Sequence, residues 1–339
     1  MILVTGATGL VGSHLLYELA LNNDIVIALK RVNSDVLFVK KVFSFYDNNY
    51  ELLFNRIKWV EGDLEDYYSL EEALIGIDYV YNCAGLISFD KQDFNKLIDI
   101  NYKGTANLIN ACISSGVKKL VHVSSIAALG RAKQNIETTE ELQWEDSSNN
   151  SGYSISKHLA EMEVWRGSEE GLNICIINPS IIIGPGFWDY GSGRMIKIMW
   201  DGLKFYTKGT NGFVDVKDVA KSMIILMNSD INKQRYIINS ENVDYKLFYE
   251  LVSKYLNIAP PKYFANKCLS SIAWRFLKLF SLITCKKPLI TKETARTANQ
   301  TYKYNSNKFI NEFDYKFISI EQSIKNTCEL FLTDIKNKK

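Results

Sequence analysis

The sequence has few of the residues that build metal centres and disulfide frameworks. It holds six cysteines, none of them in a C-x-x-C pair, and only three histidines, which do not have ligand-like spacing. The cysteines are therefore expected to be reduced, in a reducing compartment, and no metal site is predicted. The lack of a metal motif argues against a zinc-dependent dehydrogenase.

The chain also lacks an excess of charge of one sign. Forty Lys and Arg residues face 38 Asp and Glu residues, which leaves a formal net charge of +2. No global field attracts nucleic acid or an anionic membrane, so any basic preference must be local. Met1 leads directly into an apolar, strand-like run, without the basic start and separate apolar stretch of a secretory signal. A cytoplasmic location is expected.

Long hydrophobic runs are missing as well. The segment 268–284 comes nearest to one, but Arg275 and Lys278 interrupt it and it is too short to span a bilayer. It favours an amphipathic helix that covers the core; the alternative is a helix that walls an apolar substrate cleft or rests on a membrane surface. Over residues 268–287 the apolar positions of this helical pattern are Leu269, Ile272, Ala273, Phe276, Leu279, Phe280 and Ile283, and the polar ones are Arg275, Lys278, Lys286 and Lys287.

Short, β-rich apolar runs alternate with longer helical patterns over the first 178 residues. The runs lie at 2–6, 24–30, 57–63, 78–85, 118–125 and 172–180, and helical periodicity covers 10–21 and 93–115, where Gly116 is placed to end the second helix. This alternation predicts an α/β fold, in which helices cover both faces of a doubly wound parallel sheet.

A glycine-rich turn follows the first predicted strand. Gly6 permits a tight turn, Gly9 lets the backbone approach a pyrophosphate, and Gly12 lets helix and strand pack closely. The pattern predicts a Rossmann-like dinucleotide site, with the anion at the helix N-terminus. The residues assigned to this turn are Thr5, Gly6, Thr8, Gly9, Leu10, Val11 and Gly12.

The domain organisation follows from this site. We expect residues 1–178, completed by 213–240, to form the dinucleotide-binding domain. Residues 179–212 and 241–339 are expected to form a smaller, mainly helical lobe that binds the substrate over the carboxyl edge of the sheet.

Two cations end the second predicted strand, where NAD-preferring proteins of this fold place an acid. Lys30 and Arg31 stand there. A guanidinium holds a 2′-phosphate with paired, charge-assisted hydrogen bonds, which favours NADP(H) over NAD(H). NAD(H) remains the alternative if the two cations simply end a strand.

Three Tyr-x-x-x-Lys pairs occur, and only Tyr153/Lys157 lies between strands whose ends meet at one sheet edge, after Ser124 and Ser125. The other two pairs are Tyr263/Lys267 and Tyr304/Lys308. A nearby ammonium lowers a tyrosine pKa from about 10 and makes the phenol a usable acid.

Together, TGATGLVG, VHVSSIAALG, NPSIIIGPG and FVDVKDVA resemble segments of the extended short-chain dehydrogenase/reductase (NAD-dependent epimerase/dehydratase) family, over nearly the whole chain. The likeness is to its dihydroflavonol reductase and 3β-hydroxysteroid dehydrogenase branch, where Arg31 matches a phosphate-binding arginine. Asn178 replaces the family's usual arginine, and Cys83 also departs from the pattern.

The resemblance implies roles for further residues. Asp63, with Leu64, would bind the adenine, unless Asp63 only caps a helix beginning near Leu64. Cys83, Ala84 and Gly85 would line the ribose through their backbone, and Pro179 and Ile181 would contact the nicotinamide amide. Asn101 would order a proton-relay water; the alternative is an asparagine tolerated in a helix.

The same resemblance implies a catalytic Ser125, Tyr153 and Lys157, with Ser124 beside the cofactor. A reductase or dehydrogenase would then act on a small carbonyl or alcohol, apolar if 268–284 walls the cleft, and a homodimer is compatible with this reading. The alternatives are a nucleotide-sugar epimerase with tightly held NAD and a non-catalytic cofactor-binding protein. Ile126 and Ala127 stand where dehydratases carry acids, which argues against dehydration.

Overall fold

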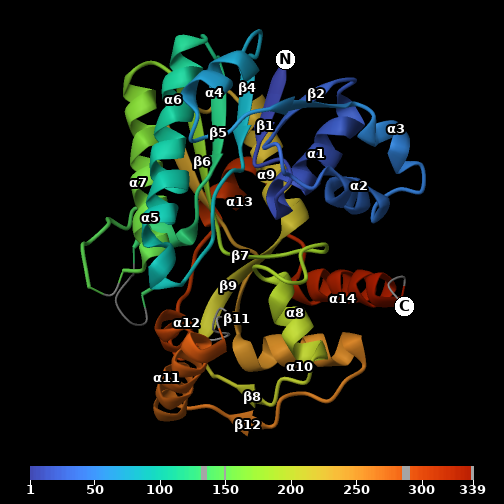
Figure 1. The fold of residues 1–339 in the computed structure, drawn as a ribbon, viewed down its shortest axis with the longest axis vertical. Helices are drawn as coiled ribbons and strands as arrows, with labels where there is room; N and C mark the ends of the chain where they lie inside the picture. Colours follow the sequence, from blue (N-terminus) through green and yellow to red (C-terminus); the bar gives the residue numbers. More distant parts are fainter. Residues whose placement is uncertain (131–135, 149, 285–290, 337–339) are drawn as a thin grey trace.

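A seven-stranded, wholly parallel sheet forms the centre of the computed structural model, which describes residues 1–130, 136–148, 150–284 and 291–336 (Figure 1). Its order is β10-β6-β5-β4-β1-β2-β3, so the chain reverses direction across the sheet between β1 and β4. The α/β, doubly wound fold class is confirmed. The strands are β1 (Ile2–Thr5), β2 (Val26–Lys30), β3 (Ile57–Glu61), β4 (Tyr79–Asn82), β5 (Lys119–Val123), β6 (Asn173–Pro179) and β10 (Gln234–Ile238).

Helices cover both faces of this sheet, because neighbouring strand residues bury side chains on opposite sides. Leu3 and Val4 of β1 are both fully buried, each in a different core cluster. One face carries α1 (Leu10–Asn22), α2 (Val36–Ser44), α3 (Tyr50–Phe54), α9 (Val216–Asn228) and α13 (Asn307–Phe313). The other carries α4 (Tyr67–Ala73), α6 (Gly104–Ser114) and α7 (Gly152–Glu169).

The predicted helix over 93–115 is interrupted. A short turn η1 (Lys91–Asp93) and α5 (Phe94–Leu97) lead into a π-helical turn, η2 (Ile98–Lys103), and only then into α6. Side-chain hydrogen bonds from Asn101 tie this turn to the backbone of Leu86, and such π turns occur often at functional sites. Gly116 ends α6 at φ +70°, as predicted.

The remaining elements gather below the carboxyl edge of the sheet (Figure 1). Phe213 and Phe248 stack at 5.0 Å in their own hydrophobic core. Two small sheets belong to this region, with the orders β11-β9-β7 and β12-β8. The strands are β7 (Ile181–Ile183), β8 (Phe205–Tyr206), β9 (Thr210–Asp215), β11 (Glu241–Asp244) and β12 (Tyr263–Phe264); the helices are α8 (Gly193–Trp200), α10 (Tyr245–Leu256), α11 (Lys267–Thr284), α12 (Lys292–Thr297) and α14 (Ile320–Lys336).

The outer edge of β10 is covered by side chains from distant segments. The carboxylate of Glu140 accepts a hydrogen bond from the Ile237 amide at 2.7 Å. The hydroxyl of Ser306 accepts one from the Asn239 amide, just after the strand, at 2.9 Å. These two acceptors satisfy amides that would otherwise face outward from the sheet.

The described part of the chain contains no helix that is both long and apolar enough to cross a bilayer. Within that same part, no cluster of three or more His, Cys, Asp or Glu residues is arranged to hold a metal ion. Five of the six cysteines lie there and all are free thiols, with Cys268 exposed and Cys83 partly buried.

Candidate active site

The glycine turn joins β1 to α1 and forms a cradle of bare backbone. Gly6 adopts φ +61°, and a Cβ there would come within 2.5 Å of the Ala84 amide nitrogen. A Cβ on Gly12 would overlap the carbonyl oxygen of Gly6. Gly9 caps α1 without a side-chain hydrogen bond, so the first amides of the helix face outward. This donor set fits the pyrophosphate of a dinucleotide.

The turn after β4 is held against this cradle. The hydroxyl of Thr5 donates to Asn82 Oδ1 at 2.6 Å, and the Ala84 amide donates to the same oxygen at 3.2 Å. A Cβ on Gly85 would lie 3.8 Å from the Lys157 ammonium nitrogen. The segment predicted to line the cofactor ribose therefore borders both the glycine cradle and Lys157.

The two cations after the glycine turn have different surroundings. Lys30 on β2 pairs with Glu61, its register partner on β3, at 2.7 Å. The Arg31 side chain is exposed, and no described residue holds its guanidinium. Of the two, Arg31 is the one free to meet a phosphate.

Asp63 follows β3 and accepts a hydrogen bond from the Glu65 amide at 3.2 Å. The alternative that Asp63 caps a helix beginning near Leu64 is wrong, because α4 starts at Tyr67 and Asp66 caps it. Leu64 itself is buried in the core beside Gly104. The Asp63 carboxylate is thus not used as a helix cap.

Ser125, Tyr153 and Lys157 come together at the carboxyl end of β5. Ser125 follows this strand and opens the turn η3 (Ile126–Leu129), while Tyr153 and Lys157 lie one turn apart at the start of α7. Ser151 and Ser154 cap α7 reciprocally, which fixes where the helix begins. The Ser125 side chain lies close enough to Tyr153 to act on the pKa of the phenol.

The other two Tyr-x-x-x-Lys pairs are not arranged in this way. Tyr263 lies on β12 and Lys267 begins α11, so the pair spans two elements. Tyr304 precedes α13, whose Lys308 hydrogen-bonds Gln234 and the Arg235 carbonyl. Only the first pair shares one helix.

Burial dominates the electrostatics of the two catalytic candidates. It raises the pKa of Tyr153, and the Ser125 side chain acts in the opposite direction. Burial also lowers the pKa of Lys157 from 10.5 to about 8, while the nearby Glu161 carboxylate acts against this shift. The Lys157 ammonium donates to the Val123 carbonyl at 2.8 Å. The pKa of Tyr153 is therefore shifted upward by burial, opposite to the lowering suggested by the sequence.

Asn101 is buried in the π turn and its side chain is fully engaged. Its Oδ1 accepts from the Leu86 amide at 2.7 Å, and its Nδ2 donates to the Leu86 carbonyl at 3.0 Å and to Ser156 at 2.9 Å. These bonds tie the loop after β4 to α7. Asn101 therefore has a clear structural task beside the candidate site.

Sequence reasoning missed Glu161, which lies on α7 one turn after Lys157. Its side chain is only 1% exposed. One carboxylate oxygen accepts hydrogen bonds from Ser124 at 2.7 Å and from Asn178 at 2.8 Å. The same Asn178 amide donates to the Ser125 carbonyl at 3.0 Å. The spacing Tyr-x-x-x-Lys-x-x-x-Glu, which repeats at one helical turn, could have identified this residue.

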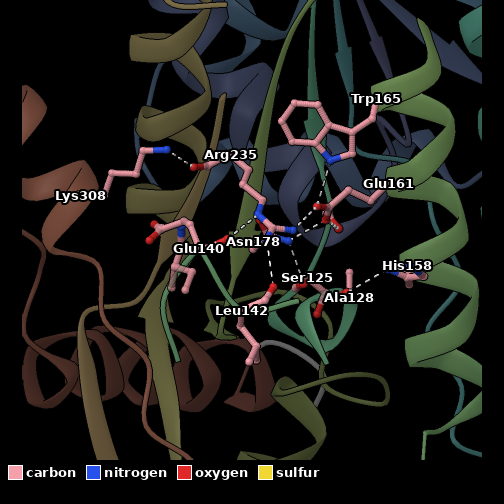
Figure 2. Close-up of polar contacts among 12 residues, drawn as sticks. Ser125, Ala128, Glu140, Leu142, His158, Glu161, Trp165, Asn178, Arg235 and Lys308 are labelled. Atoms are coloured by element: carbon pink, nitrogen blue, oxygen red, sulfur yellow. Dashed lines mark hydrogen bonds and ion pairs between the residues drawn. The ribbon is translucent and has the colours of Figure 1, made fainter. Parts of the chain in front are cut away.

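Arg235, on β10, balances this buried carboxylate, as Figure 2 shows. Its guanidinium lies 3.1 Å from the second oxygen of Glu161. It also donates to the carbonyls of Glu140 and Leu142, the latter at 3.1 Å. Asn178 stands where the family resemblance expects an arginine, and Arg235 brings a guanidinium to the same cluster from another strand.

Comparison with known proteins identifies the family. The model of the NAD dependent epimerase/dehydratase family matches residues 2–239, the span that contains all seven strands of the large sheet. The chain belongs to this family.

Named relatives are reductases and related enzymes. The chain is 30% identical to sterol demethylase protein B of Methylococcus capsulatus over 71% of its own length and 70% of the relative's. It is 26% identical to a putative dihydroflavonol 4-reductase of Synechocystis, over 97% and 93% of the two chains. The solved structure of gox2253 matches with a TM-score of 0.80 and 26% identity, over 98% of each chain.

The NAD-dependent epimerase/dehydratase family consists of enzymes of the oxidoreductase type that use a nicotinamide cofactor, and the expectation of such an enzyme is confirmed. The resemblance stated from the sequence motifs is confirmed as well. The glycine cradle, α1 and the turn after β4 all lie within the matched residues.

Proposed function

We propose that this protein is an NADP(H)-dependent reductase or dehydrogenase that transfers hydride between nicotinamide and a carbonyl or secondary alcohol. The observation that carries the proposal is the meeting of Ser125, Tyr153 and Lys157 at the end of β5, beside the glycine cradle. Under this proposal residues 1–178 with 213–240 hold the cofactor, and residues 179–212 with 241–339 hold the substrate.

The bound cofactor would supply the hydride. Tyr153 donates the proton that turns the carbonyl oxygen into a hydroxyl, and its raised pKa keeps the phenol protonated at neutral pH. Ser125 donates a hydrogen bond that polarises the same oxygen. Lys157 would hold the nicotinamide ribose. In the oxidative direction the same groups accept and relay the proton.

Each of the other parts of the cofactor is proposed to contact a different segment of the chain. The cradle from Thr5 to Gly12 would bind the pyrophosphate, Asp63 the adenine, and the backbone of Cys83 to Gly85 the ribose. The backbone of Pro179 and Ile181 would reach the nicotinamide amide. Preference for NADP(H) is supported by Arg31, whose exposed guanidinium no described residue holds.

The substrate is proposed to be a small, apolar carbonyl or alcohol compound. The names of two relatives refer to a sterol and to a dihydroflavonol, both of which are ring systems with large apolar surfaces. Phe89 packs edge-to-face on Tyr153 with ring centroids 5.7 Å apart, so an apolar surface borders the proposed proton donor.

The alternative is a nucleotide-sugar epimerase that retains its NAD, since the family includes epimerases. Oxidation of NADPH and NADH with a panel of aldehydes and ketones would be followed spectrophotometrically, beside an epimerisation assay with UDP-glucose. We expect turnover of NADPH with at least one carbonyl and no epimerised sugar. Epimerisation without net cofactor turnover would establish the alternative instead.

A further inference from the structure

One end of the molecule combines exposed apolar side chains with a basic sequence. Residues 251–292 contain eight Lys and Arg residues and no Asp or Glu, although acidic and basic residues are nearly balanced over the whole chain. This stretch includes the end of α10, β12 and all of α11, and β8 pairs with β12. Strands β8 and β12 and helix α11 all lie at the lower end of the molecule, away from the large sheet (Figure 1).

Exposed apolar side chains occur both on these strands and on the helix that follows them. Ile272 is 60% exposed and Phe276 is 68% exposed, on the same side of α11 as Leu269. Only Ala265 and Asn266 separate β12 from α11, and the Asn266 side chain accepts from the Leu269 amide at 2.9 Å. We define the apolar end face by its exposed members: Phe205, Tyr263, Leu269, Ile272 and Phe276.

The opposite side of α11 is anchored to the protein. Ser270 is buried and accepts a hydrogen bond from Asn299 at 3.0 Å. Ile272 and Phe276 therefore point away from the contact that holds the helix. Helix α11 is thus held against the protein through Ser270, and its exposed apolar side chains lie on the other side of the helix.

Cations border this face. Arg275 lies 4.7 Å from the centre of the Trp274 ring. Lys204, Lys262 and Lys267 are also exposed on the same three elements or directly beside them. The nearest acid along the chain to β8 is Asp201, at the end of α8.

We propose that the apolar end face docks reversibly on an anionic phospholipid surface. Apolar side chains inserted at the headgroup boundary and a basic border attracted to anionic lipid are the two components of interfacial binding. A symmetric dimer through this face would place two basic borders against each other, which like-charge repulsion disfavours. The proposal is independent of the chemistry at Tyr153.

The test is co-sedimentation of the full chain with sucrose-loaded vesicles. One set is phosphatidylcholine alone, and the other contains about 30% phosphatidylglycerol. We expect binding to the anionic vesicles only, with a loss when salt rises from about 0.1 to about 0.5 M. Absence of binding to anionic vesicles at low salt, or equal binding to both sets, would overturn the proposal.

Two sets of substitutions test separately how the apolar side chains and the cations contribute to vesicle binding. Ile272→Asn with Phe276→Asn should lower partitioning at least about tenfold, and so should Lys262→Gln, Lys267→Gln and Arg275→Gln together. The matched control is Leu37→Asn with Leu52→Asn, which removes side chains 75% and 72% exposed on α2 and α3 at the other end of the molecule. This control should bind like the wild type, and losses as large as those of the first pair would overturn the assignment to this face.

Light scattering after gel filtration tests whether a second copy of the chain, instead of a lipid surface, covers this face. A wild-type dimer that the Ile272→Asn, Phe276→Asn pair converts to a monomer would show that a second copy covers the face, and would overturn the proposal. Vesicle binding needs no turnover, so a chain that binds anionic vesicles but reduces no carbonyl would keep this inference and lose the proposed function.

A second inference rests on different contacts and on the proposed function. We infer that Glu161 and Arg235 are positioning residues that fix Ser125 opposite Tyr153. Arg235 neutralises Glu161, Glu161 orients the Asn178 amide, and that amide holds the Ser125 carbonyl. Ser124 donates to the same carboxylate, so two consecutive residues of the serine turn are tied to α7.

Arg235→Met leaves a buried carboxylate without its cation. At a temperature where circular dichroism shows a folded protein, we expect kcat to fall between about ten- and a hundred-fold, because small displacements of reacting groups have effects of that size. KM for the cofactor should change little, and Arg235→Lys should restore much of kcat. If Arg235→Met does not fold, Glu161→Gln with Arg235→Gln avoids the unpaired charge and should still lose kcat.

Asp334→Asn is the control for a purely structural loss. Asp334 is also buried, accepts from Trp188 at 2.6 Å and pairs with Lys41, far from Ser125 in the fold. It should lower stability and leave kcat at a permissive temperature unchanged. An unchanged kcat in Arg235→Met would refute the positioning role. Undiminished turnover in Tyr153→Phe, measured first, would instead refute the proposed function.

Discussion

The Lys157 ammonium donates to the carbonyl oxygen of Val123 at 2.8 Å, at the end of the strand that leads to Ser125. A buried helix lysine is thereby fastened to the sheet edge where the catalytic candidates meet. Its pKa falls to about 8 because burial disfavours the charged form. The site therefore holds a cation whose charge is lost within an accessible pH range.

The lowered lysine pKa has opposite consequences for activity and stability. Turnover is expected to decline as pH rises through about 8, where the ammonium loses its proton. The unfolded chain binds more protons than the folded chain between pH 8 and 10.5, so this group alone makes stability rise with pH across that window. Comparing the wild type with Lys157→Met isolates the contribution of Lys157 to the pH dependence of stability. If the variant kept the wild-type pH dependence, the lowered pKa of Lys157 would be contradicted.

Lys157→Met should also raise the free energy of unfolding at neutral pH, by about 1 to 3 kcal/mol, since it removes a buried charge while keeping an apolar stem. Turnover and cofactor affinity should both fall. Urea unfolding at pH 7 and cofactor titration measure the two effects. Loss of stability in this variant would show that the hydrogen bond to Val123 outweighs the cost of burying the ammonium.

Tyr153→Phe removes only the proton-donating hydroxyl. We expect turnover to fall by about 10² to 10⁴, with cofactor affinity largely unchanged. Single-turnover kinetics with NADPH and the best carbonyl of the panel, beside a fluorescence titration of NADPH, would give both values. Tyr263→Phe is the matched control, since that tyrosine heads a Tyr-x-x-x-Lys pair split between β12 and α11; it should behave like the wild type.

Arg31→Ala should weaken NADPH binding by about 1.5 to 3 kcal/mol, the usual contribution of a charged hydrogen bond, which corresponds to roughly ten- to a hundred-fold. NADH affinity should hardly change. Lys30→Ala is the matched comparison. Because Lys30 already pairs with Glu61, its removal is expected to lower NADPH affinity less than Arg31→Ala does. Titration of both cofactors decides the matter: equal losses for NADPH and NADH, or tighter NADH binding by the wild type, would refute the phosphate role.

Gly12→Ala should damage the cofactor cradle, because the new methyl group would overlap the Gly6 carbonyl oxygen. We expect a loss of at least about 2 kcal/mol in stability and little cofactor binding. Gly9→Ala is a milder change, since its methyl group would lie 3.2 Å from the same oxygen. Thermal unfolding with and without cofactor would compare the stability and cofactor binding of the two variants. Equal losses in both variants would argue against the close packing of α1 on the turn.

The large sheet and the glycine turn could be predicted because both follow from local patterns. Buried parallel strands read as short apolar runs, and Gly6, Gly9 and Gly12 lie within seven residues. The π turn could not be predicted, because it depends on hydrogen bonds between Asn101 and a loop 15 residues away. Strand β7, which has only three residues, is too short to stand out from its surroundings.

Long-range pairing explains the rest of what the sequence did not reveal. Lys30 meets Glu61 only through the register of β2 and β3. Glu161 and Arg235 are 74 residues apart, and nothing near either residue indicates the other. Tyr153 and Lys157 were singled out because they are one helical turn apart and lie between two predicted strands whose ends meet. Charge partners on separate elements become visible only when the sheet order is known.

The side chains that cover the edge of β10 affect how the protein is inactivated by heat. Its amide acceptors, Glu140 and Ser306, belong to segments outside the sheet, 97 and 67 residues away from their partners. Local opening of those segments would bare the strand while the core is still folded. The bared edge can then template intermolecular strand addition, so thermal inactivation should proceed by aggregation from a nearly native state rather than by reversible unfolding.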